Sequence, residues 1–227
     1  MRRLAVALLV AGLAVIVLGI ARGGASPETE LSYELAWEWG DARPVDGGWS
    51  VTTDAGHDVV VTGGELTTYS ATVVECPHSH SIWSRVTGVF GSVAAAGHGE
   101  DGEEQVTAVV VQSLADPTTA TLGSSLGHEQ SYCEGHTAFG NEDGGTTMWI
   151  EGTADGVPFR IETADAWGAK AELTADFDGG DPTTIVVSRD LGALLDDVAF
   201  DTMTPDEQGR AMLRSLAAHT AFAALSS

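Results

Sequence analysis

Four of the seven histidines lie within five residues of one or other of the chain's two cysteines. The two segments contain Cys76, His78 and His80 in one case, and His128, Cys133 and His136 in the other. Neutral imidazole is a common ligand of both copper and zinc, and several rings held near one point can bind one ion. The spacing therefore indicates a metal site, and it does not distinguish copper from zinc.

A disulfide between Cys76 and Cys133 would hold these two segments together. The Cα atoms of bridged cysteines lie about 4.4–6.8 Å apart, and a chain advances at most about 3.3–3.6 Å per residue. The nearest histidines would then stay close to one point, and His98 and His128 extend the set. The candidate metal ligands are His78, His80, His98, His136 and His128. The other interpretation is that polar histidines simply surround a structural disulfide.

The N-terminus has the features of a targeting segment. Arg2 and Arg3 precede an apolar run, Leu4–Ile20, and small residues follow at positions 23–25. We predict residues 1–25 to be a signal peptide or, since about 17 apolar residues is the lower limit for crossing a bilayer, an uncleaved N-terminal anchor. Export would make the protein periplasmic, cell-surface or extracellular, and cysteines in those compartments usually pair. Two buried thiols are the alternative to a disulfide.

The chain is strongly acidic, because its 10 lysine and arginine residues stand against 33 aspartate and glutamate residues, a net charge of −23. Three arginines lie in the N-terminal segment, so residues 26–227 keep seven basic residues and carry a net charge of −26. Such a field disfavours nucleic acid and anionic lipid surfaces as partners and attracts cations. Adaptation to high salt accounts for the same acidity without any ligand. The membrane becomes a partner only if the N-terminal segment is retained.

Short β-branched or alternating runs, separated by Gly, Asp and Pro clusters, dominate the rest of the chain. This spacing predicts an all-β fold, an antiparallel β-sandwich, as one domain over residues 26–227. The predicted strands are Trp49–Thr53, Asp58–Thr62, Glu65–Val74, Gln105–Leu114, Tyr132–Phe139, Thr146–Gly152, Val157–Ala164, Lys170–Phe177 and Thr183–Ser188.

Two C-terminal segments have helical features instead. We predict a short helix over Leu191–Val198 and a longer one over residues 204–225. In the longer one Thr204 can cap the first turn, Pro205 suits that turn, and Glu207 completes a capping box. Helical spacing then places four residues on one face that would pack on the sandwich. They are Met212, Leu216, His219 and Ala223.

No arrangement of residues predicts catalysis. Gly123–Gly127 spells a nucleophile elbow, but that motif needs a hydrophobic strand before it and a helix after it. We predict neither at this position. No nucleophile–base pair and no carboxylate dyad is identifiable by spacing, so we expect the protein not to be an enzyme.

A series of short motifs follows a fixed order along the chain. They are Tyr69-Ser70, Cys76, Ala96-Gly97-His98, Gly127, Tyr132-Cys133, His136 and Leu195–Phe200. This order resembles a group of uncharacterised exported bacterial proteins and, more distantly, periplasmic copper-binding β-sandwich proteins of methanobactin operons. The resemblance implies a secreted or periplasmic sandwich with one disulfide and a connection to copper. It carries over no catalytic residue, and the tryptophan-based copper site of the distant group has no aligned position here.

Together these features predict an exported carrier or sequestering protein whose partner is a copper or zinc ion. The alternative is a metal-free envelope or surface interaction module with a structural disulfide. In that case the partner would be another envelope protein, and the histidines would be incidental.

Overall fold

The computed structural model describes residues 28–76, 104–128, 130–141, 143–176 and 181–226. This part of the chain forms two β-sheets, and one helix, α2 (Pro205–Ala218), precedes the last strand. The predicted β-sandwich with a C-terminal helix is therefore confirmed. The predicted targeting segment lies outside the described residues. Within them, no helix is both long and apolar enough to cross a membrane.

Most strands alternate buried and less buried positions, as strands with one face in a core do. In chain order they are β1 (Glu28–Glu38), β2 (Arg43–Val45), β3 (Gly48–Thr52), β4 (Asp58–Glu75), β5 (Gln105–Ser113), β6 (Ala120–His128), β7 (Ser131–Phe139), β8 (Met148–Ala154), β9 (Val157–Thr163), β10 (Trp167–Asp176), β11 (Thr183–Asp190) and β12 (Thr220–Ser226).

The smaller sheet has four strands in the order β12-β11-β1-β6. Its inner strand β1 pairs in parallel with β11, with Leu31 opposite Thr183 and Glu38 opposite Asp190. On its other side β1 pairs antiparallel with β6. The prediction of a wholly antiparallel sandwich is thus wrong for one pair of strands. The error arises because strand direction depends on which distant segments meet, and the local pattern of residues does not encode that.

The larger sheet has eight strands and is organised by β4, which is 18 residues long. The first part of β4 pairs with β3 and β8, and the second part pairs with β5 and β7. The register shifts between Val61 and Gly63 and again between Thr68 and Ser70. The two strands predicted over Asp58–Thr62 and Glu65–Val74 are therefore one strand, interrupted by bulges rather than by a turn.

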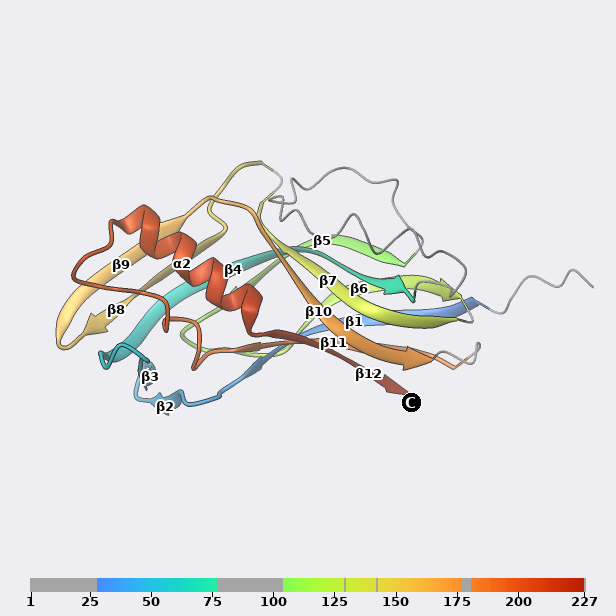
Figure 1. Ribbon diagram of the computed structural model, residues 1–227, viewed down its shortest axis with the longest axis horizontal. Coiled ribbons are helices and arrows are strands. Elements are labelled where there is room, and N and C mark those ends of the chain that lie inside the picture. The colour runs from blue at the N-terminus through green and yellow to red at the C-terminus, as the bar shows by residue number, and fades with distance from the viewer. Residues whose placement is uncertain (1–27, 77–103, 129, 142, 177–180, 227) are drawn as a thin grey trace, which may run out of the picture.

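Two apolar cores lie along β4. One fills the space between the two sheets and includes Leu31, Tyr132 and Ile185. The other includes Trp49 and Leu213 and lies where α2 packs against β9 and β10. Figure 1 shows this division, with α2 beside β8 and β9 at one end of the molecule and the two sheets layered at the other.

The helix α2 begins as predicted and ends earlier. Thr204 accepts a hydrogen bond from the backbone N–H of Glu207, whose side chain accepts one from Thr204 in return, which completes the capping box. The prediction of helix over residues 204–225 is wrong beyond Ala218, because Thr220–Ser226 forms strand β12 against β11. The alternation of this segment suits a strand, and the exposed edge of β11 provides the pairing. The helix predicted over Leu191–Val198 is also wrong, since that segment is a series of turns.

Candidate functional site

The predicted disulfide is present. Cys76 at the end of β4 and Cys133 in β7 are bridged, with their Cα atoms 4.8 Å apart. The two strands are adjacent, and the backbone N–H of Cys76 also donates to the carbonyl oxygen of Ser131 at 2.9 Å. The bridge therefore joins strands that are already paired, at the end of the sandwich away from α2.

His136 lies near this bridge on the outer face of the larger sheet. Its neighbour Gly135 faces the interior against Phe222, so the alternation of the strand turns His136 and Glu134 outward. Glu134 lies 3.2 Å from the Nε2 atom of His136 and 2.7 Å from the Nζ atom of Lys170. The contact with Lys170 lowers the pKa of Glu134. The side chain of His136 is 41% exposed, so its contact with Glu134 is accessible to solvent.

Of the other predicted ligands, only His128 lies among the described residues. His128 lies at the end of β6 in the opposite sheet, where its backbone N–H donates to the Tyr132 hydroxyl. His78, His80 and His98 lie outside the described residues. Within the described ranges, no three His, Cys, Asp or Glu side chains are grouped so that they could hold a metal ion.

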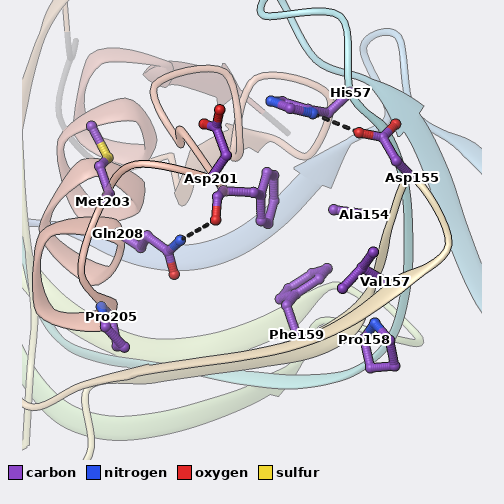
Figure 2. Close-up of a pocket in the computed structure, with 11 residues that line it drawn as sticks. His57, Ala154, Asp155, Val157, Pro158, Phe159, Asp201, Met203, Pro205 and Gln208 are labelled. Atoms are coloured by element: carbon purple, nitrogen blue, oxygen red, sulfur yellow. Dashed lines mark hydrogen bonds and ion pairs between the residues drawn. The ribbon is translucent and has the colours of Figure 1, made fainter.

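A pocket of about 440 Å³ lies at the opposite end of the molecule. One wall is the β8–β9 hairpin and the other is the chain that enters α2, with its first turn (Figure 2). Its lining residues are His57, Ala154, Asp155, Val157, Pro158, Phe159, Phe200, Asp201, Met203, Pro205 and Gln208. Most of these side chains are apolar, and a few polar groups stand among them, which is the usual composition of a small-molecule site.

A histidine–aspartate pair stands at the edge of this pocket. The Nδ1 atom of His57 lies 2.7 Å from Oδ2 of Asp155, and Oδ1 of Asp155 accepts the backbone N–H of Asp58 at 3.0 Å. The hydrogen bond to His57 is the main cause that lowers the pKa of Asp155. The pair ties the start of β4 to the β8–β9 turn, where Asp155 has a φ of 50° and Gly156 a φ of 79°.

The opposite wall of the pocket is built from aromatic and amide side chains. The Phe200 ring lies 5.0 Å from the Phe159 ring and 5.6 Å, edge on, from the His57 ring, measured between centroids. Gln208 of α2 is buried, and its Nε2 atom donates to the carbonyl oxygen of Phe200 at 3.5 Å (Figure 2). Asp201 is exposed and has no ion pair or hydrogen bond within the described part of the chain.

An arginine is buried where the two sheets meet. Arg189 of β11 is fully buried, donates to Thr68 Oγ1 at 3.0 Å and to Gln112 Oε1, and stacks with its Cζ atom 4.4 Å from the Trp37 ring centroid. No carboxylate pairs with it among the described residues, and its Nε atom and Trp37 Nε1 are buried without an acceptor there. Burial lowers the pKa of Arg189 to about 9, because the charged form loses its hydration.

The pocket could not be predicted from the sequence, because its residues come from three distant segments. Asp155-Gly156 between two predicted strands is a signal for a tight hairpin turn, and it could have placed one wall. Nothing in the local pattern around His57 or Phe200 indicates that they meet this hairpin. Comparison of the chain with protein-family models, with curated proteins and with solved structures finds no match.

Proposed function

We propose that this protein is an exported, non-catalytic binding protein whose ligand is a small molecule held between the β8–β9 hairpin and the start of α2. The observation that carries the proposal is the pocket of about 440 Å³ with a mostly apolar lining. Its size lies within the range of roughly 300–1,000 Å³ that is usual for small-molecule sites. The disulfide supports a location outside the reducing cytosol.

The lining favours binding over catalysis. None of the described residues that line the pocket is a serine, threonine, cysteine or lysine, the side chains that most often act as nucleophiles. The His57–Asp155 pair resembles part of a catalytic constellation, but its hydrogen bonds tie β4 to the β8–β9 turn. This role in positioning two chain segments explains the pair without a reaction.

Filling the entrance of the pocket is expected to abolish ligand binding. Val157 lines the pocket and is 66% exposed, so Val157→Trp adds bulk there without displacing a core side chain. Ligand-observed NMR with a fragment mixture should find compounds that bind the native protein and bind Val157→Trp at least about tenfold more weakly. Val111→Trp is the matched control, since Val111 is 55% exposed on β5 and is not part of the lining. Equal binding to native protein and Val157→Trp, or no binding fragment at all, contradicts the proposal.

A second candidate function is the binding of copper or zinc by His78, His80, His98, His136 and His128. The specific observation in its favour is the disulfide, which keeps Cys76 and Cys133 within 4.8 Å between Cα atoms. His136 is three residues from one cysteine and His78 is two residues from the other. By chain length alone, each lies within about 7–11 Å of its cysteine.

Metal analysis separates this candidate from a metal-free protein. Protein purified without an affinity tag should contain close to one copper or zinc ion per chain, and His78→Ala with His80→Ala should remove most of it. His219→Ala is the matched control, because His219 caps α2 and is remote in sequence from both cysteines. A double variant that keeps the metal content of the native protein, or a native protein without metal, rules out this candidate.

A further inference from the structure

We infer that the pocket selects a small organic cation, an ammonium group carried on an apolar or aromatic body. This inference rests on the proposed function, since it names the class of ligand that would occupy the same pocket. Three features of the described residues carry it: an available carboxylate, two aromatic faces, and the absence of basic side chains from the lining.

The carboxylate is that of Asp201. The two oxygens of the other lining carboxylate, Asp155, are already engaged by His57 and by the backbone N–H of Asp58. Asp201 has no such partner in the described part of the chain and lines the same pocket. A carboxylate beside an apolar surface attracts a cation more strongly than one in open water, because the local dielectric is lower.

The aromatic faces are those of Phe159 and Phe200. Their centroids lie 5.0 Å apart and both rings line the pocket. The negative face of an aromatic ring attracts a cation within about 6 Å of its centroid, and quaternary ammonium ligands are commonly recognised in this way. A cation between Asp201 and these rings would gain both interactions, whereas a neutral ligand would gain only the apolar contact.

The charge of the protein also favours a cationic ligand. No lysine or arginine is among the described lining residues, so nothing in the lining repels a cation or pairs with an anion, apart from His57 when protonated. The whole chain carries −23, which raises the local concentration of cations and lowers that of anions. Val157, Pro158, Met203 and Pro205 supply contacts for an apolar body.

Three ligands with the same ring test the inference directly. Benzyltrimethylammonium is the cation, benzyl alcohol the neutral analogue and phenylacetate the anion. The readout is the ¹³C-methyl NMR signal of Met203, which lines the pocket, with the signals of the buried Met148 and Met212 as internal references. The Met203 signal is assigned by its loss in Met203→Leu. The cation is expected to shift this signal and to bind at least about tenfold more tightly than either analogue.

Three variants separate the effect of charge from the effect of shape. Asp201→Asn keeps the size of the side chain and is expected to weaken binding of the cation about three- to tenfold, with no effect on benzyl alcohol. Asp46→Asn removes one charge from the exposed β2–β3 turn, away from the lining, and is expected to leave affinity unchanged. Phe200→Leu keeps an apolar surface without the aromatic face and should weaken the cation selectively.

The outcomes are distinct for the two proposals. Equal binding of all three ligands overturns cation selectivity and leaves an apolar binding pocket in place. If Asp201→Asn and Asp46→Asn lose the same affinity for the cation, the attraction is due to the net charge of the protein and not to Asp201, which also overturns the inference. No shift of Met203 with any of the three overturns this inference, and the fragment screen on Val157→Trp then decides separately whether the pocket binds small molecules.

Discussion

Replacing Arg189 with alanine is expected to lower the free energy of unfolding by about 3–5 kcal/mol. The substitution removes a large side chain that is fully buried between the two sheets. It leaves Gln112 Oε1 and Thr68 Oγ1 without their donor, and it takes the guanidinium from the face of Trp37. The lost hydrogen bonds join β11 to β4 and β5, and the lost ring contact joins it to β1, so the whole sandwich should be weakened. Urea unfolding followed by tryptophan fluorescence measures the change.

Arg189→Met distinguishes volume from charge at this position. Methionine fills much of the space without a buried charge, and the cost of burying that charge is what lowers the pKa of Arg189. We therefore expect Arg189→Met to lose about 1–2 kcal/mol less than Arg189→Ala. Arg43→Ala, at an exposed position of β2, should change stability by less than about 0.5 kcal/mol. If the two Arg189 variants are equally unstable, the hydrogen bonds rather than the filled volume stabilise the junction.

Removing the disulfide is expected to cost about 3–4 kcal/mol. The bridge spans 57 positions of sequence, so its loss frees a long loop in the unfolded chain. The variant is Cys76→Ala with Cys133→Ala, which leaves no unpaired thiol. β4 and β7 should stay paired, because their backbone hydrogen bonds extend along the strand from Thr68 to Glu75. The predicted result is a lower unfolding midpoint with unchanged far-ultraviolet circular dichroism.

Reduced native protein provides the control for this double variant. Both lack the covalent link, so their unfolding midpoints should agree if the loss is due to the bridge itself. A loss below about 1 kcal/mol in both would show that residual structure already restricts this loop in the unfolded chain. A lower midpoint in the double variant than in the reduced native protein would instead indicate that the alanines disturb packing beside β7.

The sequence was most informative where local chemistry determines the outcome. The alternating strands and the cap of α2 by Thr204 and Glu207 follow from neighbouring residues, and the pairing of the two cysteines was predicted from the expected export of the chain. Prediction from the sequence failed where a strand pairs with a segment that is distant along the chain. The predicted strands omit the segment Gly123–Gly127, which contains two glycines and two serines, yet pairing with β1 makes it part of β6. The same applies to β12, which continues as a strand because β11 offers an open edge.

The candidate site could not be predicted for the same reason. The histidines that cluster in the sequence lie beside the cysteines, whereas His57 has no cysteine near it along the chain. His57 meets Asp155 across 98 positions of sequence, and Phe200 meets both the His57 and Phe159 rings. Residues that converge only through the pairing of β4 with β8 leave no spacing to recognise. Arg189 is a similar case, since nothing adjacent to it indicates burial.

The place of β1 in the smaller sheet has a consequence for the order of assembly. β1 is the first strand of the described chain, but its parallel neighbour β11 begins about 150 positions later, at Thr183. A chain that is synthesised or released from its N-terminus can pair β1 with β6 once residues 120–128 are free, but the other edge of β1 stays open until β11 follows. Pairings this distant are slow to close. Until then the buried side chains of β1, Leu31, Tyr33 and Leu35, lack part of their cover, so this interval is the period in which the nascent protein is most prone to aggregate.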